Sequence, residues 1–299
     1  GSSRAARMLL VGKYTSVRLS GARTYHRQMG IRVVEGRGGR VRTSDGAWLV
    51  DCLAGAGSLS LGHGHPVVTE AVQQVLAAGA PLQLLDLDNP WLEAFATEFL
   101  PTLPGTLATT AVLHLCPPSG AAAVEAALIA AEIATARSNH VALEGSFHGC
   151  TRGARAVSGS PALRDTFPMS TTSVRFLPFP GTRCLSAGLS QGSSTLELES
   201  ALASKPPAAV IVEAVQGEGG CRRLPDDWLE ELRRAATQVG AVLIADEIQA
   251  GSGRTGRMWS TEHSGVEPDM LIASKGLGAG LPLAVLALRP DLDRWSAGT

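Results

Sequence analysis

Short segments made only of apolar residues recur in the second half of the chain, and they constrain the fold more than any other feature. These segments are residues 209–212, 241–245, 270–273 and 283–288. A strand that is apolar on both faces needs cover on both faces, which is typical of a parallel sheet between helices. A helical period at residues 226–239 separates two of them. We therefore predict an α/β fold in which helices cover a mostly parallel sheet.

The middle of the chain continues this alternation of strands and helices. Residues 112–115 and 141–143 are strand-like, and helical periods are predicted at residues 66–76, 90–100 and 120–136. Such alternation indicates one large α/β domain.

The N-terminal part has a different pattern. Short apolar runs on either side of Asp45-Gly46 predict a small β-meander between residues 30 and 52. Residues 1 to about 21 carry no clear period, and we expect a loosely held arm there. These features predict an N-terminal arm and part of a small domain at residues 1–65, and a large domain at residues 66–299.

Composition excludes several classes of protein. Of the 299 residues, 44% are hydrophobic and 18% charged, and the net charge of −1 comes without a sustained basic run, which argues against a nucleic-acid partner. Five scattered cysteines without a CxxC pair fit a reducing compartment and argue against a disulfide framework or a zinc site. No apolar stretch reaches the roughly 18 uncharged residues of a membrane helix. We expect a cytoplasmic protein without a membrane segment.

Two chemically distinctive residues follow neighbouring predicted strands. Asp246 comes directly after residues 241–245, and Lys275 comes just after residues 270–273, in a run that contains Gly276, Gly278 and Gly280. In parallel sheets, the loops at the carboxyl ends of the strands build the ligand site. Either residue alone is a weak signal, because most such acids cap turns and most lysines are solvated. Together they match the two poles of pyridoxal phosphate (PLP): the lysine for the aldehyde carbon and the carboxylate for the ring nitrogen.

A third element could bind a phosphate. Ser119, Gly120 and Ala121 join a predicted strand to the long Ala-rich helix, where small residues leave the helix amide groups open to an anion. Many α/β proteins have such a turn. The competing interpretation, a dinucleotide-binding fold, lacks the G-x-G-x-x-G that it needs.

The histidines allow structural interpretations as well. His63 and His65 are expected to shape a turn rather than bind a metal, because no third ligand is evident and we predict no metal site. For His148, a structural role and a place in the site remain equally open.

Several motifs together resemble one known family. Residues 246–249, 251–256, 268–269, 274–276 and 280–283 resemble the signature of class III PLP-dependent aminotransferases. Residues 213–220, 147–149 and 62–66 look like further blocks of that family, and all of them occur in the family's order. Within the family, the runs 53–59, 62–63, 176–180 and 281–285 are most similar to diaminobutyrate 2-oxoglutarate aminotransferases.

The resemblance implies roles for individual residues in binding the cofactor. Lys275 would hold PLP as a Schiff base and carry the proton of the 1,3-shift, and Asp246 would keep the ring nitrogen protonated. Ser119, Gly120 and Ala121 would bind the phosphate. The remaining cofactor contacts would come from Phe147 on the ring face, from His148 beside it and from Gln249 near the ring hydroxyl.

The resemblance also implies a fold, substrates and an assembly. Glu218 matches an acid that pairs with a substrate-binding arginine and moves aside in one half reaction, and Glu213 matches a second, supporting acid. The implied fold is the fold-type I architecture with an N-terminal part of a small α+β domain. The implied reaction moves a terminal amino group between a diamino acid, such as 2,4-diaminobutyrate, and 2-oxoglutarate or glutamate. A homodimer is expected.

The chain also departs from the family pattern. Ala214 stands where proline is common, Ala122 where an acid is common and Ser252 where an aromatic residue is expected. Family members also continue beyond Thr299 into a C-terminal part of the small domain, so we expect that part to lie outside this chain. Two alternatives stay open: other PLP chemistry (an aminomutase, a decarboxylase or a γ-replacement enzyme), or a truncated homologue that binds the cofactor without turnover.

Overall fold

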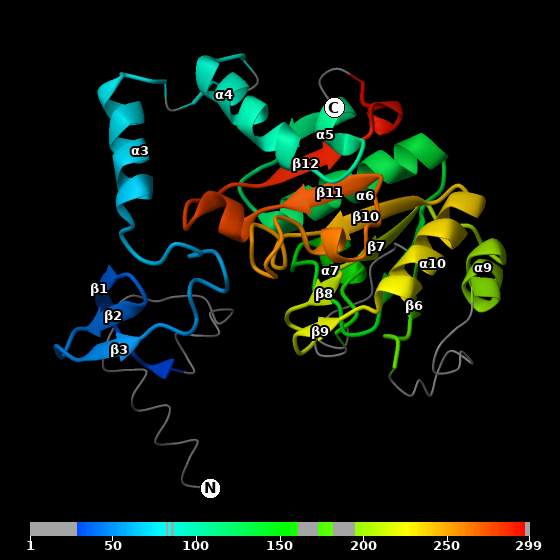
Figure 1. Ribbon diagram of the computed structural model, residues 1–299, viewed down its shortest axis with the longest axis horizontal. Helices are drawn as coiled ribbons and strands as arrows, with labels where there is room; N and C mark the ends of the chain where they lie inside the picture. Colours follow the sequence, from blue (N-terminus) through cyan, green and yellow to red (C-terminus); the bar gives the residue numbers. More distant parts are fainter. Residues whose placement is uncertain (1–28, 82, 85–86, 161–172, 182–194, 297–299) are drawn as a thin grey trace, which may run out of the picture. The chain divides into compact units, whose positions relative to one another are not determined.

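The computed structural model describes residues 29–81, 83–84, 87–160, 173–181 and 195–296 (Figure 1). The predicted arm at residues 1–21 lies outside these residues. The chain divides into two compact units, residues 1–81 and 82–299. The small domain predicted for residues 1–65 stays a prediction. No helix in the described part of the chain is long and apolar enough to cross a membrane.

The described part of the first unit is a three-stranded antiparallel meander followed by a helix. The meander has the order β1 (Val33–Arg37), β2 (Arg40–Thr43) and β3 (Trp48–Val50), and α3 spans Pro66–Ala77. Gly46, with a φ of +91°, lies in the turn between β2 and β3, where a residue without a Cβ is least strained. The meander, its Asp45-Gly46 turn and the helix that begins at Pro66 are thus confirmed.

The second unit is built on a seven-stranded sheet. Its strand order is β4 (Val112–Leu115), β12 (Val285–Leu288), β11 (Met270–Ala273), β10 (Val242–Asp246), β7 (Ala209–Val212), β5 (Asn139–Leu143) and β6 (Ser173–Leu177). Neighbours from β11 to β6 are parallel, whereas β12 is antiparallel to both β11 and β4. The prediction of a mostly parallel sheet is confirmed.

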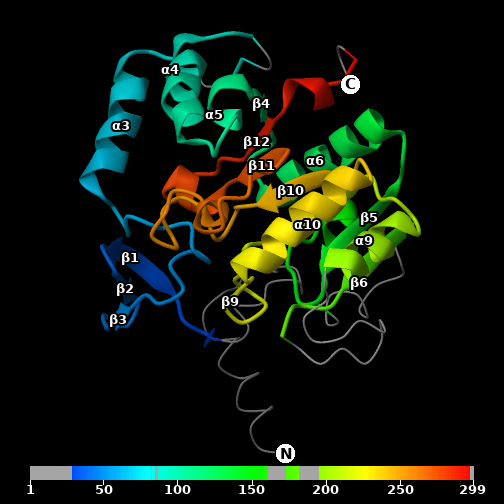
Figure 2. The ribbon, with the colours of Figure 1, turned by 45° about the vertical axis from the view of Figure 1, so that its right-hand side comes forward.

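Helices cover both faces of this sheet (Figures 1 and 2). On one face, α6 (Gly120–Thr135) packs in a core cluster with Val242 and Ile244 of β10. On the other face, α10 (Asp226–Gln238) packs in a cluster with Leu243. Successive side chains of a strand point to opposite faces, so a fully apolar strand supplies both layers at once. This explains why the apolar segments predicted the sheet so directly.

Shorter elements complete the second unit. They are α4 (Pro90–Phe99), η1 (Leu100–Thr102), α5 (Leu107–Thr110), α7 (Arg152–Ala156), α9 (Thr195–Ala203), β8 (Val215–Gln216), β9 (Arg222–Arg223), η2 (Ser260–His263), η3 (Lys275–Gly278) and η4 (Pro290–Leu292). The helix at Pro90 was predicted, whereas β6, α7, α9 and the β8–β9 hairpin were not. Several predicted bounds shift by one or two residues; for example, β12 begins at Val285 rather than at residue 283, and Asp246 is the last residue of β10 rather than the residue after it.

Candidate active site

Three neighbouring parallel strands end at the same edge of the sheet. A polar residue lies at the end of each strand or soon after it. β7 leads directly into Glu213, β10 ends at Asp246, and β11 leads through Ser274 into Lys275. In the register, Val212 lies beside Ala245, and Asp246 lies beside Ile272. Because of this pairing, residues far apart in sequence come together at one edge.

A cavity of about 210 Å³ opens at this edge. The residues that line it are Ser119, Gly120, Ala121, Phe147, His148, Gly149, Glu213, Asp246, Ile248, Gln249 and Lys275. Every residue that the sequence predicted for cofactor binding is among them. The cavity therefore gathers an amine, two carboxylates, an imidazole and a helix N-terminus.

Asp246 and His148 form a buried pair beside the cavity. His148 Nδ1 lies 2.6 Å from Asp246 Oδ2, and both residues are less than 4% exposed. Asp246 Oδ1 accepts a hydrogen bond from the backbone amide of Ile248 at 3.0 Å. Burial alone would lower the pKa of His148, but the hydrogen bond to Asp246 and the charges of Asp246 and Glu213 outweigh it, so the pKa is raised. The imidazole is thus held as a donor to Asp246.

Glu213 is a second buried carboxyl group at the site, only 4% exposed. Its Oε2 accepts a hydrogen bond from the backbone amide of Phe147 at 3.0 Å. Burial raises its pKa to about 7; the nearby charge of His148 acts against this shift and the charge of Asp246 adds to it. A group with this pKa can exchange a proton near neutral pH.

Lys275 has an uncommon backbone conformation. Its φ of +43° lies in the left-handed region, which is energetically unfavourable for any residue that has a side chain. Residues in such strained conformations cluster at functional sites. Burial lowers the pKa of the Lys275 amine, and the positive charge of Arg254 lowers this pKa further. The negative charges of Asp246, Glu218 and Glu213 act in the opposite direction. A lowered pKa increases the fraction of neutral, nucleophilic amine.

The N-terminus of α6 forms another wall of the cavity. Helix α6 begins at Gly120 with Ser119 as its N-cap residue, and Ala121 follows. A Cβ on Gly120 would lie 2.9 Å from Ile248 Cδ1, so glycine lets the helix end approach the segment that follows β10. Helix N-termini carry partial positive charge and free amide groups, which favour anions.

Glu218 is the one predicted site residue that does not line the cavity. It is exposed, and its Oε1 accepts a hydrogen bond from Gln249 Nε2 at 3.4 Å, which links it to the lining. A Cβ on Gly217 would lie 1.5 Å from Gln249 Oε1, so a larger residue here would displace the Gln249 side chain. Glu218 is thus tied to the cavity through Gln249.

Sequence reasoning missed two lining residues, Gly149 and Ile248. Both lie inside motifs that were singled out, next to His148 and between Asp246 and Gln249. The two histidines predicted to shape a turn have separate places: His63 forms a β-bridge with Gly38 and its Nε2 lies 2.7 Å from Asp51 Oδ2, whereas His65 is the N-cap residue of α3. The described residues contain no group of three or more His, Cys, Asp or Glu side chains that could hold a metal ion.

Known proteins share both this motif order and this fold. The model of the aminotransferase class-III family matches residues 21–296. The chain belongs to the class-III aminotransferase family. A diaminobutyrate–2-oxoglutarate aminotransferase of Rhizobium meliloti is 41% identical over 290 residues, and one of Haemophilus influenzae is 39% identical over 287 residues. These matches cover 94% and 92% of this chain but 62% of each relative, so the chain spans about three fifths of their length.

Solved structures agree with this assignment. An amine transaminase from an uncultivated Pseudomonas species, solved in its PLP-bound form, superposes with a TM-score of 0.79 at 26% identity and covers 94% of this chain and 66% of that one. The ornithine aminotransferase of Toxoplasma gondii superposes with a TM-score of 0.77, also at 26% identity, over 94% of this chain and 63% of that one. The fold-type I architecture follows from these neighbours and from the mostly parallel sheet.

Proposed function

We propose that this chain holds the cofactor site of a PLP-dependent aminotransferase that moves a terminal amino group between 2,4-diaminobutyrate and 2-oxoglutarate or glutamate. The observation that carries the proposal is the single cavity that joins Lys275, Asp246 and the N-terminus of α6. The substrate pair is suggested by the names of the relatives from R. meliloti and H. influenzae.

The residues present fit PLP. The cofactor has an aldehyde, a basic ring nitrogen and a phosphate, and the cavity offers an amine, a carboxylate and a helix N-terminus. His148 Nε2 is buried without a hydrogen-bond partner among the described residues, on a ring whose other nitrogen already pairs with Asp246. A buried polar atom without a hydrogen-bond partner indicates that the site can accommodate a further polar group.

When bound, PLP would supply a ring that withdraws electrons from the substrate carbon. Lys275 Nζ would hold the cofactor through its aldehyde carbon and, when free, would take the proton from the substrate carbon, for which a lowered pKa is suited. Asp246 would hold a proton on the ring nitrogen. His148 would orient the Asp246 carboxylate through the 2.6 Å hydrogen bond.

The other lining residues would orient the cofactor and the substrate. Ser119, Gly120 and Ala121 would bind the phosphate, and Phe147 would cover one face of the ring. Gln249 would contact the ring hydroxyl. Glu218 and Glu213 would contact the substrate side, where Glu213 with its pKa of about 7 can keep its proton.

Assembly and location belong to the proposal as well. We infer a homodimer with amino acid and 2-oxo acid substrates, in the cytoplasm. Nothing in the chain's charge pattern favours a nucleic-acid partner. Other PLP chemistry, or cofactor binding without turnover, remains the competing function.

One experiment separates these functions. The purified protein is titrated with PLP, then with 2,4-diaminobutyrate and then with 2-oxoglutarate, while visible absorbance is recorded and products are analysed. We expect an absorbance band that shifts with the amine and returns with the oxo acid, while glutamate forms. A band that never responds would support the non-catalytic homologue, and products other than glutamate would support another PLP reaction. The absence of any band would contradict the cofactor assignment.

A further inference from the structure

The β8–β9 hairpin carries Glu218 in its turn. Gln216 of β8 pairs with Arg222 of β9, and the turn between them is closed by the amides of Gly220 and Cys221, which both donate to the carbonyl of Gly217. Each strand of this hairpin has only two residues. So short a ladder cannot hold its own turn in place, because isolated two-stranded pairs are marginal in water. Contacts outside the hairpin must therefore position Glu218.

Arg222 and Gln216 supply those contacts together. Arg222 Nη2 donates to Gln216 Oε1 at 2.6 Å and to the carbonyl of Glu144 at 3.3 Å, and Gln216 Nε2 donates to the same carbonyl at 3.2 Å. Gln216 is fully buried. The guanidinium also lies 4.2 Å from the centre of the Phe179 ring, a cation–π contact that orients it. Two side chains of the hairpin thus converge on one carbonyl of the neighbouring turn.

That neighbouring turn leads directly into the cavity. It follows β5 and runs from Glu144 through Gly145 to Phe147 and His148. Gly145 has a φ of +78°, and a Cβ there would lie 2.1 Å from Arg222 Nη2. The conformation favours glycine, and a side chain here would displace the guanidinium from its present place.

We propose that Arg222 is a positioning residue that couples the turn carrying Glu218 to the turn carrying Phe147. The inference rests on the proposed function, in which Glu218 contacts the substrate side and Phe147 covers the cofactor ring. The planar guanidinium uses one nitrogen for two acceptors while its face packs on Phe179. A lysine has the charge but not the planar group that packs on Phe179, so it can replace the contacts of Arg222 only in part.

The test compares two arginines of the same strand. Arg222→Met keeps an apolar stem over Phe179 and removes the hydrogen bonds. The matched control is Arg223→Gln, because among the described residues the Arg223 side chain pairs only with exposed Asp226, through two contacts of 2.7 Å. Arg222→Lys serves as the conservative variant if Arg222→Met does not fold. Hydrogen exchange is measured on the cofactor-free protein, and PLP affinity, KM and kcat are measured on the loaded protein.

Coupling predicts that both turns respond to one change. In Arg222→Met, amide exchange should rise at residues 145–147 and at residues 217–221 together. The Kd for PLP and the KM for 2,4-diaminobutyrate should rise roughly tenfold, the scale of one lost charge-assisted hydrogen bond, with a much smaller change in kcat. Arg222→Lys should show the same changes to a smaller extent.

Three outcomes would overturn the inference. They are faster exchange in the hairpin alone, a KM equal to that of Arg223→Gln, or an Arg222→Lys protein that matches the unsubstituted one at both turns. Failure of the proposed function is distinguishable, since the unsubstituted protein would then show no PLP band or no glutamate, while the exchange comparison would still report on the coupling.

Discussion

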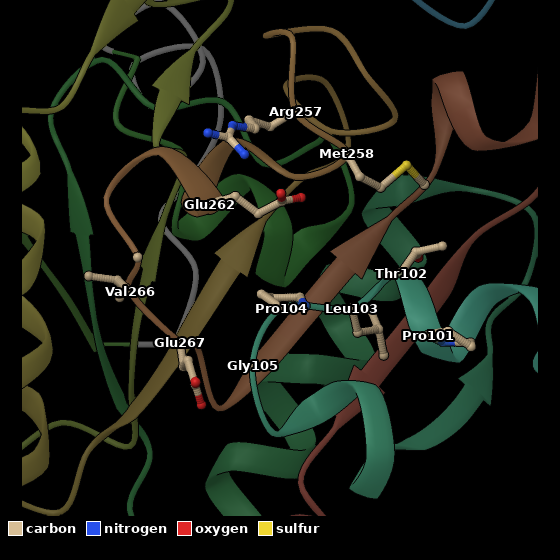
Figure 3. A pocket seen from close by; sticks show the side chains of 11 residues that line it. Pro101, Thr102, Leu103, Pro104, Gly105, Arg257, Met258, Glu262, Val266 and Glu267 are labelled. Carbon is tan, nitrogen blue, oxygen red and sulfur yellow. The ribbon is translucent and has the colours of Figure 1, made fainter.

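Two hollows in the described part of the second unit differ in character. The candidate active site has a volume of about 210 Å³, whereas a hollow between residues 101–105 and 257–267 has about 490 Å³ (Figure 3). Polar side chains that line the larger hollow make hydrogen bonds to the protein segments around it. Glu262 Oε1 accepts a hydrogen bond from the amide of Trp259 at 2.7 Å, and Glu267 Oε2 accepts from the amide and the hydroxyl of Thr106, both at 3.2 Å.

The smaller hollow has a different electrostatic character. Burial lowers the pKa of Lys275 and raises the pKa of Glu213. The pKa of His148 is raised, because its hydrogen bond to Asp246 and the nearby negative charges outweigh the effect of burial. Shifts of this kind cluster at functional sites, because catalytic groups need a pKa suited to proton transfer. The comparison teaches that convergence of titratable groups from several strand ends identifies the site better than volume does.

Removing the amine should have the largest effect. We expect Lys275→Ala to lower turnover by at least about a thousandfold, because a nucleophile that acts with its neighbours is not replaced by them. The absorbance band of bound PLP should be lost as well. Lys205→Ala is the matched control, because Lys205 is exposed and, within the described part of the chain, its amine hydrogen-bonds only Ser173 Oγ, at 3.4 Å. Undiminished turnover in Lys275→Ala would refute the role of this cavity.

The next effect should come from the carboxylate. Asp246→Asn keeps the shape of the side chain but cannot hold a proton on the ring nitrogen through charge. We expect kcat to fall about a hundredfold or more, because a hundredfold is the lower end of the rate effect of a group that assists proton transfer. Steady-state kinetics together with circular dichroism would check this. A folded Asp246→Asn protein with unchanged kcat would contradict the assignment.

Glu213 should give a pH-dependent effect on stability. Its pKa is about 7 when folded and the usual value is 4.5, so the folded state keeps a proton that the unfolded chain loses. The contribution of Glu213 to the free energy of unfolding should therefore be complete below about pH 4.5 and should be lost as the pH rises to about 7. Glu213→Gln should flatten that decline, by on the order of 3 kcal/mol at most.

Denaturant unfolding at pH 5 and pH 7.5 would measure the flattening. The raised pKa of His148 acts with the same sign, but its contribution is lost only above the usual histidine value of 6.5. A Glu213→Gln protein whose stability varies with pH as steeply as the unsubstituted one would show that Glu213 ionises normally.

The smallest effects should come from the larger hollow. Arg257→Gln changes an exposed residue of its lining, and we expect turnover and KM to stay within about twofold, as for surface substitutions of about 0.5 kcal/mol. Kinetics with the same substrates would check this. A loss comparable to that of Asp246→Asn would break the distinction between the two hollows.

Prediction of the fold from sequence succeeded where burial was complete. Residues 209–212 and 270–273 were predicted to the residue, and both strands are buried along their whole length. The strand β6 was missed because only Leu177 at its end is buried, so its sequence shows no clear period. The β8–β9 hairpin was missed because two residues per strand are too few to show any period.

The site shows the same division. Lys275 and Asp246 could be paired from sequence because parallel strand ends meet at one edge, and all the predicted lining residues do meet there. The hydrogen bond between His148 and Asp246 joins residues 98 positions apart, and the contact between Arg222 and Glu144 joins residues 78 apart. No local pattern encodes such contacts.

The sequence by itself thus determined the layers of the sheet, the motifs at its carboxyl edge and the family. All three rest on local information, namely the alternation of apolar side chains and the spacing of small and polar residues. Only the tertiary structure decided which carboxyl group has a raised pKa, which amine has a lowered pKa, and which arginine contacts the turn after β5. Those properties depend on removal from water and on partners brought together by folding, and therefore on the whole set of neighbours around each group.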